Sequence, residues 1–379
     1  MKVILTQANL TLKGGAERVV LKIAQHYDAP IYVAEYDKNA TFEEFEELDI
    51  NVITDNKKTT SRAMQGLKYS KFLNYKIEED YDVINAHIAP SHWIRRLNER
   101  VLWYCHTPLR EIYDLYKYRQ SLRSFYKRPI YAIGAYFMRN IDKKIVNNIE
   151  YIFANSENTK SRIIKYYGRE DAKVLNGCIE IERFRNESND KYFFYPSRFS
   201  PNKRQLYAIE AFNLFKKKYK KGNYKLVIAG AVSKDPLYYN YYLKVKERAE
   251  KVGDVEILAD IDDERLVDLY SRCTAVLYTP INEDYGLVPL EGMASSKPVI
   301  AINEGGPRET IEDKKTGYLI NSENEMAEKM QMLAENPDLV DELGKKGLKH
   351  VKAHYSWEHF FEVFDKALYK VANAEEDKP

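Results

Sequence analysis

The feature that most constrains the fold is an alternation of short apolar runs with longer helix-forming runs, repeated along the whole chain. Strands that alternate with helices pair in parallel, because each helix carries the chain back across the sheet. The sequence therefore predicts an α/β fold of two tandem doubly wound, Rossmann-like domains. The strands are expected at 2–6, 29–34, 50–53, 81–87, 101–105, 151–156, 172–177, 192–197, 225–230, 255–258, 275–279, 299–303 and 316–320.

A polar segment that is poor in apolar residues, 186–191, interrupts this alternation and has the composition of a linker. We therefore expect an N-terminal domain over 1–187 and a C-terminal domain over 188–355, followed by a last helix within 356–373. The charged tail, 374–379, is expected to be frayed.

Composition excludes several classes of protein. The net charge of +2 is too small to indicate a nucleic-acid partner. Three widely spaced cysteines, Cys105, Cys178 and Cys273, with no C-x-x-C pair fit a reducing compartment rather than a disulfide framework or a zinc ribbon. No apolar run reaches the length of about 18 residues that spans a membrane, and the N-terminal apolar run is too short for a signal peptide. We expect a cytoplasmic protein.

Two glutamates, Glu283 and Glu291, follow the expected strand 275–279 on a loop and at the start of a helix. Ligands of open α/β sheets bind at the carboxyl ends of strands, so both carboxylates could face one crevice. Acids at a helix N-terminus also favour the helix dipole, and position alone does not separate the two interpretations.

Arg198 and Lys203 lie on the loop that follows the expected strand 192–197. Arginine offers a planar fork and lysine a point charge, which together suit a diphosphate. The alternative is a pair of exposed surface cations, but their place at a strand end favours the phosphate clamp.

In the N-terminal half, Gly14 and Gly15 stand between a strand and a helix, where backbone N–H groups can bind an anion. The alternative is a tight turn that needs glycine. His87 and His106 also end expected strands, and a histidine there has an unperturbed pKa near neutrality. Either histidine could instead be held for structure; the arginine at 110 makes a functional role for His106 the preferred interpretation. A cleft between two such sheet edges is the default ligand site.

The segment 110–144 combines nine basic and three acidic residues with interleaved aromatic residues. This chemistry suits an anionic membrane surface or a phosphorylated acceptor, and a single-stranded nucleic acid would bind similar groups. The alternative is a solvated helix pair whose aromatic residues belong to the core.

Five motifs taken in order resemble the family 4 retaining glycosyltransferases, which have the GT-B fold. They are Gly14-Gly15-Ala16-Glu17, His106-Thr107-Pro108, Ser197-Arg198-x4-Lys203, the stretch from Glu283 to Glu291, and Gly305-Gly306-Pro307-Arg308-Glu309. Tyr285 stands where the family more often has phenylalanine. The segment 103–114 is similar to a subgroup that includes mannosyltransferases using GDP-mannose for cell-surface polysaccharides. The helix after Trp357 looks like the GT-B terminal helix that crosses back to the N-terminal domain.

This resemblance implies a role for each residue of the C-terminal half. Glu291 would hold the ribose hydroxyls of a nucleotide by charge-assisted hydrogen bonds. Glu283 would contact hydroxyls of the donor sugar. Backbone N–H groups of Tyr285, Gly286 and Leu287 would lie near the sugar and the phosphates.

The catalytic set implied by the resemblance is His106, Arg198, Lys203 and Glu283. The two cations would stabilise the departing diphosphate, where charge builds in the transition state. Gly14 would let the backbone approach that diphosphate, together with Gly15, and His106 would contact the donor sugar or orient the acceptor.

The resulting prediction is a retaining hexosyltransferase that needs neither a metal nor another cofactor. It would move a hexose, with mannose as a candidate, from a GDP- or UDP-linked donor to a glycan or lipid-linked acceptor. It would use 110–144 to work as a peripheral protein at the inner membrane face. The alternatives are a sugar-nucleotide epimerase or a non-catalytic nucleotide-sugar-binding protein on the same fold.

Overall fold

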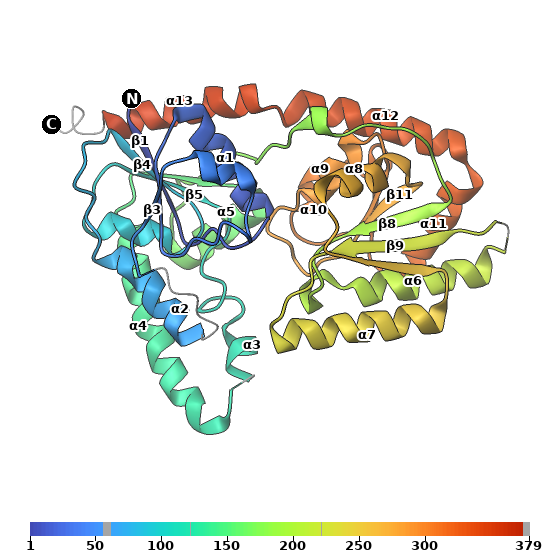
Figure 1. The fold of residues 1–379 in the computed structure, drawn as a ribbon, viewed down its shortest axis with the longest axis horizontal. Coiled ribbons are helices and arrows are strands. Elements are labelled where there is room, and N and C mark those ends of the chain that lie inside the picture. The colour runs from blue at the N-terminus through green and yellow to red at the C-terminus, as the bar shows by residue number, and fades with distance from the viewer. Residues whose placement is uncertain (56–61, 122, 221, 374–379) are drawn as a thin grey trace. The chain divides into compact units, whose positions relative to one another are not determined.

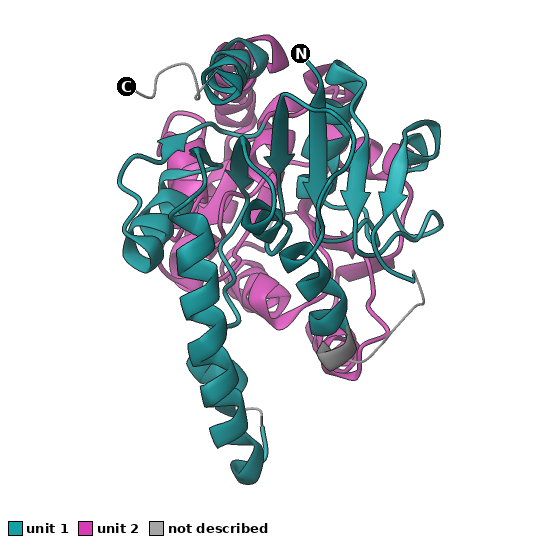
Figure 2. Ribbon diagram, turned by 90° about the vertical axis from the view of Figure 1, so that its left-hand side faces the viewer, with its two compact units in different colours: residues 1–177, 360–379 teal, residues 178–359 magenta. Residues whose placement is uncertain are grey.

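The computed structural model describes residues 1–55, 62–121, 123–220 and 222–373. The chain divides into two compact units (Figures 1 and 2). Unit 1 comprises Met1–Gly177 together with the chain from Phe360 onwards, and unit 2 comprises Cys178–His359. The tail 374–379, expected to be frayed, lies outside the described residues.

Unit 1 contains a parallel sheet of seven strands in the order β3-β2-β1-β4-β5-β6-β7. Its strands are β1 (Val3–Gln7), β2 (Ile31–Val33), β3 (Ile50–Val52), β4 (Val83–Ala86), β5 (Val101–Cys105), β6 (Tyr151–Ala154) and β7 (Lys173–Val174). Its helices are α1 (Gly15–Tyr27), α2 (Arg62–Tyr69), α3 (Tyr116–Ser121), α4 (Arg128–Val146), α5 (Glu157–Tyr167) and most of α13 (Trp357–Ala372). Both faces of the sheet are covered, so strands such as β5 are apolar and buried throughout.

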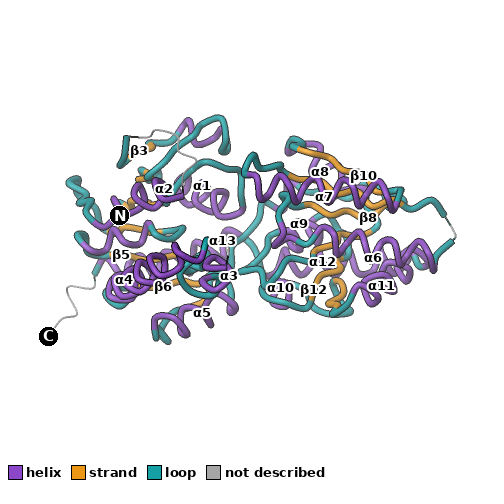
Figure 3. Tube along the Cα trace, turned by 90° about the horizontal axis from the view of Figure 1, so that it is seen from below, coloured by secondary structure: helices purple, strands orange, loops and turns teal. Residues whose placement is uncertain are grey.

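Unit 2 contains a parallel sheet of six strands in the order β10-β9-β8-β11-β12-β13. Its strands are β8 (Tyr192–Pro196), β9 (Lys225–Gly230), β10 (Val255–Ala259), β11 (Ala275–Tyr278), β12 (Val299–Ile302) and β13 (Gly317–Ile320). Its helices are α6 (Gln205–Lys218), α7 (Pro236–Val252), α8 (Asp263–Arg272), α9 (Val288–Ala294), α10 (Pro307–Thr310), α11 (Glu323–Glu335) and α12 (Pro337–His354). One face of the sheet packs against α6, α7 and α11, and the other against α8 and α9 (Figures 1 and 3).

The two sheets share one topology, which confirms the predicted pair of doubly wound Rossmann-like domains. In each unit the second and third strands are added on one side of the first strand, and the fourth and later strands are added on its other side. The order therefore reverses between β1 and β4 in unit 1 and between β8 and β11 in unit 2. Ligands of such sheets bind beyond the carboxyl ends of the strands at this reversal.

The division between the units lies at Gly177 and Cys178, ahead of the expected boundary at 187 and 188. The reason is packing: Ile179 is buried in the core of unit 2, and Ile181 and Phe184 pack against that core. The polar segment 186–191 therefore lies within unit 2 rather than between the units.

The last helix, α13, belongs to unit 1 from Phe360 onwards. Tyr27 donates a hydrogen bond to Asp365 over 2.7 Å, and the rings of His26 and Phe361 stack 3.7 Å apart. Phe364 is fully buried beside Tyr104 of β5, so α13 forms part of the core of this unit. No helix of the described residues has the length and apolar content that crossing a membrane requires.

Candidate active site

The carboxyl ends of β8 and β11 bring a lysine and a glutamate together in unit 2. Lys203 ends a short 3-10 helix, Pro201–Lys203, after β8, and Glu283 lies on the loop after β11. Lys203 Nζ donates to Glu283 Oε2 over 2.8 Å, and the two side chains are only 14% and 24% exposed. The pair is 80 positions apart in sequence, and it meets because β8 and β11 are neighbours.

Tyr278, the last residue of β11, lies beside Lys203 and is influenced by the charges of other predicted residues of unit 2. Its hydroxyl is 3.4 Å from Lys203 Nζ. Burial raises the pKa of Tyr278 well above its usual range; the negative charges of Glu283 and Glu291 raise it further, and the positive charge of Arg198 opposes them. One buried phenol is thus within electrostatic reach of all these charged groups.

Glu291 lies in the first turn of α9, as its sequence position indicated. The hydroxyl of Tyr270, on α8, donates to Glu291 Oε2 over 2.5 Å. Tyr270 is fully buried, and burial together with the Glu291 charge raises the pKa of its hydroxyl well above the usual range. A neutral phenol therefore orients this carboxylate. The sequence around Glu291 did not predict Tyr270 as its partner.

Two glycines support the backbone of the Glu283 loop. Gly306 N–H donates to the Glu283 carbonyl over 2.9 Å. A Cβ atom on Gly305 would lie 2.3 Å from that same oxygen, and one on Gly306 would lie 2.1 Å from the carbonyl oxygen of Tyr285. The glycine loop after β12 therefore has to approach the Glu283 loop backbone to backbone, which explains the paired glycines of that motif.

The three residues expected to offer backbone N–H groups connect this loop to α9. Tyr285 is buried in the core of unit 2, so its side chain is not available to a ligand. Gly286 has a φ of +88°, which favours glycine, and Leu287 is the N-cap residue of α9. Arg198, the remaining predicted residue of this unit, is exposed on the loop after β8.

In unit 1, Gly14 is the N-cap of α1 and Gly15 is its first residue. A glycine at the N-cap has no side chain that could cap this helix start. A Cβ atom on Gly14 would lie 2.5 Å from Glu17 Oε2. The buried Glu17 therefore supplies a reason for glycine at position 14 that is independent of any ligand.

His106 and His87 lie side by side at the ends of β5 and β4. His87 Nδ1 is 3.1 Å from His106 Nε2, and His87 Nε2 is 2.6 Å from Asn85 Oδ1. Burial lowers the pKa of both histidines, that of His106 to about 3. Both rings are therefore neutral at physiological pH, unlike a histidine that keeps its unperturbed pKa near neutrality.

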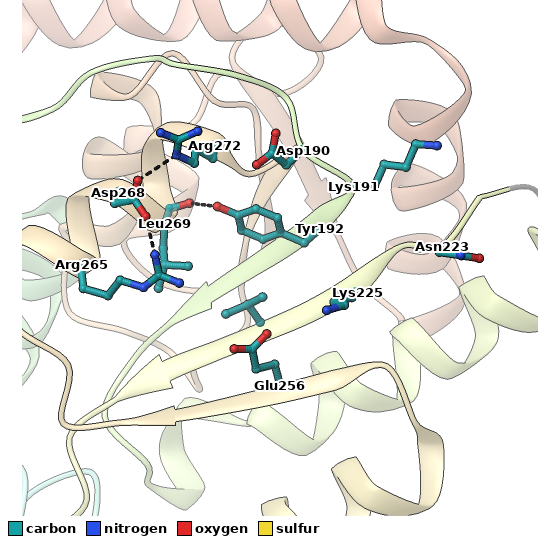
Figure 4. Close-up of a pocket in the computed structure, with 11 residues that line it drawn as sticks. Asp190, Lys191, Tyr192, Asn223, Lys225, Glu256, Arg265, Asp268, Leu269 and Arg272 are labelled. Carbon is teal, nitrogen blue, oxygen red and sulfur yellow. Dashed lines mark hydrogen bonds and ion pairs between the residues drawn. The ribbon is translucent and has the colours of Figure 1, made fainter.

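A pocket of about 340 Å³ lies at the other end of the unit 2 sheet, where β8, β9 and β10 begin (Figure 4). None of the residues that line it is a predicted site residue. Charged groups there pair with one another: Asp268 accepts hydrogen bonds from Arg265 over 2.5 Å and from Arg272 over 2.8 Å. This pocket is distinct from the carboxyl edge that gathers the charged residues around Tyr278.

Comparison with known families agrees with the two-unit architecture. The model for Glycosyltransferase Family 4 matches residues 13–183, and the model for glycosyl transferases group 1 matches residues 179–350. Together with the two doubly wound sheets, these matches show that the chain is a glycosyltransferase and belongs to family 4, with the GT-B fold.

Individual relatives match over most of their length. Human alpha-1,3/1,6-mannosyltransferase ALG2 is 26% identical to this chain, over 92% of this chain and 91% of the human protein. The crystal structure of Anabaena HepE in complex with UDP and glucose has a TM-score of 0.77 at 18% identity, covering 97% of this chain and 99% of HepE. Sucrose-phosphate synthase from Thermosynechococcus elongatus has a TM-score of 0.76 at 18% identity, covering 99% of this chain and all of that chain. The two structural likenesses show a shared fold.

Proposed function

We propose that this glycosyltransferase moves a mannose from a nucleoside diphosphate donor to a glycan or lipid-linked acceptor, with retention of configuration. The observation that carries the proposal is the gathering of Arg198, Lys203, Glu283 and Glu291 around Tyr278, at the strand-order reversal of unit 2. The name of the human relative, a mannosyltransferase, supports the choice of sugar. We propose a GDP- or UDP-linked donor. The HepE complex contains UDP, and GDP-mannose is the first donor to test.

The charged groups divide the donor between them. Glu291, oriented by Tyr270, would accept hydrogen bonds from the ribose hydroxyls. Glu283 would accept hydrogen bonds from hydroxyls of the sugar, and Lys203 and Arg198 would face the diphosphate. The 2.8 Å contact between Lys203 and Glu283 holds the ammonium group in place before the donor arrives, which lowers the cost of reorganisation.

The chemistry proposed is a substitution at the anomeric carbon on a single face of the sugar. The bond from that carbon to the leaving phosphate oxygen breaks, the bond to the acceptor oxygen forms on the same face, and the phosphate oxygen takes the proton of the acceptor hydroxyl. Negative charge grows on the diphosphate, where the cations Arg198 and Lys203 would stabilise it. We propose that these two cations take the electrostatic role that a metal ion has in other transferases.

His106 is proposed to hydrogen-bond a hydroxyl of the donor sugar or of the acceptor. Because burial keeps its ring neutral, it would orient that hydroxyl rather than supply a proton from an imidazolium. Gly14 and Gly15 are proposed to contribute backbone N–H groups to the diphosphate from the start of α1.

The basic and aromatic segment 110–144 is proposed to bring the enzyme to an anionic membrane surface on the cytoplasmic side, where a lipid-linked acceptor would be found. Under this proposal the segment binds lipid headgroups as part of a peripheral membrane protein, and it does not bind nucleic acid.

The test is product analysis with GDP-mannose and with UDP-glucose, each with and without a glycan acceptor, in EDTA. We expect nucleoside diphosphate release and an α-linked product, assigned by ¹H NMR, when the right donor and acceptor are both present. Conversion of the sugar nucleotide alone into its epimer would favour an epimerase. Saturable donor binding with no transfer to any acceptor would favour a binding protein.

A further inference from the structure

Helix α4 has large apolar side chains on the side that faces water. Ile130, Ile133, Phe137 and Ile141 are 72%, 60%, 61% and 43% exposed. Their spacing of three, four and four residues places them in one row along the helix, which we call the outer stripe. The buried residues of α4, such as Ala135, fall on the opposite side.

The rotation of α4 about its axis is fixed by a buried carboxylate, so the outer stripe is held outward. Asp142 is fully buried and accepts hydrogen bonds from His92 Nε2 over 2.9 Å and Trp93 Nε1 over 2.7 Å. It also accepts hydrogen bonds from the hydroxyls of Tyr113 and Tyr167, over 3.0 and 2.8 Å. Rotating α4 to turn the stripe inward would move the Asp142 carboxylate away from these four hydrogen-bond donors.

The surroundings of the stripe are basic. Lys127 and Arg128 precede it, Lys143 and Lys144 follow it, and all four are exposed. The nearby acids are already paired or buried: the first two acids of the segment form ion pairs, Glu111 with Arg119 at 2.7 Å and Asp114 with Arg110 at 2.8 Å. The segment therefore presents surplus positive charge at both ends of an apolar row.

Further exposed aromatic rings continue the apolar surface past the start of the helix. Phe125 is 80% exposed and Tyr126 is 59% exposed, within the short 3-10 helix Phe125–Lys127 that precedes α4. In two views at right angles, the amino-terminal half of α4 projects beyond the rest of unit 1 (Figures 1 and 2). A helix that only covers a sheet presents a polar outer face, and a contiguous apolar patch of this kind marks an interaction surface.

We propose that the outer stripe inserts into the boundary between headgroups and acyl chains of an anionic bilayer, with α4 lying along the membrane plane. The basic residues at its two ends would contact the lipid phosphates, which is the charge complementarity that favours a membrane over a second copy of this chain. The inference specifies the membrane contact of the proposed function, and it does not depend on which sugar is transferred.

The experiment is co-sedimentation of the full chain with vesicles of phosphatidylcholine containing phosphatidylglycerol. The double variant Ile133→Ser/Phe137→Ser removes two exposed side chains of the stripe, so its melting temperature should match that of the wild type. We expect its partition onto anionic vesicles to fall about tenfold or more. The matched control, Tyr239→Ser/Leu243→Ser on α7 of unit 2, changes two side chains that are each 45% exposed and should bind as the wild type does.

Salt and charge variants separate insertion from charge alone. Lys143→Gln/Lys144→Gln should weaken binding at low salt, and 0.5 M NaCl should weaken but not abolish wild-type binding. Equal partition of the stripe variant and the wild type would overturn the proposal, as would a wild-type dimer that the stripe variant dissociates. Transfer to a water-soluble acceptor should be unchanged in the stripe variant; loss of transfer in every variant, with vesicle binding intact, would count against the proposed function alone.

A separate observation concerns the hydrogen-bond chain behind His106. Asn85 Nδ2 donates to the Leu102 carbonyl over 3.2 Å, which turns Asn85 Oδ1 toward His87 Nε2. His87 must then carry its proton on Nε2 and accept at Nδ1 from His106 Nε2. We infer that Asn85 and His87 are positioning residues that hold His106 in the Nε2–H tautomer, so that its Nδ1 is a hydrogen-bond acceptor for a substrate hydroxyl.

This inference rests on the proposed role of His106, and its first test does not use activity. Long-range ¹H–¹⁵N NMR of the histidine rings should show His87 and His106 neutral and protonated on Nε2. In Asn85→Leu, the single-tautomer signature of His106 should be lost, and kcat should fall more than KM rises. A proton on His106 Nδ1 in the wild type would overturn the inference, and so would an unchanged His106 tautomer in Asn85→Leu.

Discussion

The two units have the same strand order, but the residues at their order reversals differ in charge. In unit 2 the reversal carries an ammonium, a guanidinium and two carboxylates around one buried tyrosine. In unit 1 the corresponding edge carries glycines at the start of α1 and two histidines that burial keeps neutral. The edge of unit 2 therefore offers charged side chains, and the edge of unit 1 offers backbone N–H groups and neutral imidazoles, so the same topology carries two kinds of chemistry.

The largest expected effect tests the charged edge. Lys203→Ala removes the ammonium proposed to stabilise the leaving diphosphate and leaves the half-buried Glu283 without this partner. We expect the activation free energy to rise by about 3 kcal/mol, so that kcat/KM falls roughly 100-fold or more. Lys217→Ala, an exposed lysine on α6, is the control. Normal turnover in Lys203→Ala would remove Lys203 from the phosphate site.

The second prediction concerns the glycine loop that supports Glu283. In Gly306→Ala the added Cβ would lie 2.1 Å from a backbone oxygen, so the backbone has to shift. We expect a loss of roughly 2 kcal/mol in the free energy of unfolding, measured by urea denaturation, together with weaker donor binding. Gly134→Ala has no heavy atom within 4 Å of the new Cβ and lies within α4, so it should be neutral or stabilising. An unperturbed Gly306→Ala would mean that the two loops are not held backbone to backbone.

The third prediction tests the neutral edge through pH. The folded-state pKa of His106 is about 3, below the value of 6.5 in an unfolded chain. Between these two pH values His106 is protonated in the unfolded chain and neutral in the folded one. The free energy of unfolding therefore keeps its full value above pH 6.5 and falls as the pH decreases below it. The loss at pH 5 should be of order 2 kcal/mol from this residue. Urea unfolding at pH 7 and pH 5 should show a smaller difference in His106→Gln than in the wild type; an equal difference would place the titration elsewhere.

The smallest expected effect concerns the orientation of Glu291. Tyr270→Phe keeps the buried ring but removes the hydroxyl that donates to the carboxylate. We expect donor binding to weaken by about 1 kcal/mol, so that KM for the donor rises roughly fivefold with kcat nearly unchanged. Tyr192→Phe removes a hydroxyl that donates to the Leu269 carbonyl, away from the predicted residues, and serves as the control. A fall in kcat alone would assign Tyr270 to the chemical step.

Much of the fold could be predicted because apolar runs such as Val101–Cys105 and Lys225–Gly230 become strands over those same residues. The pairing of Lys203 with Glu283 was also within reach, since both follow strands of one sheet. The hydroxyl partners were not: Tyr270 meets Glu291 only through the packing of α8 against α9, and Tyr278 reads as an ordinary strand residue. The pKa of His106 depends on burial, which a strand-end position does not reveal.

The segment 110–144 shows the same limit. Its aromatic residues could have been core or surface, and the sequence left both open. The structure divides them: Tyr113 contacts the buried Asp142, whereas Phe125 and Phe137 face water. For Phe137 the outward position follows from the rotation of α4, which Asp142 sets through partners as distant as His92 and Tyr167.

The most direct test of the central claim is a thermal-shift titration with GDP-mannose and UDP-glucose in EDTA, using the wild type, Lys203→Ala, Glu291→Ala and Gly134→Ala. A true ligand raises the apparent stability in proportion to its occupancy. We expect a saturable rise in melting temperature with one of the two donors in the wild type and in Gly134→Ala, and a much weaker rise in Lys203→Ala and Glu291→Ala. Equal shifts in all four proteins, or a shift that appears only when a divalent metal is added, would contradict the proposed metal-independent donor site at Lys203 and Glu291.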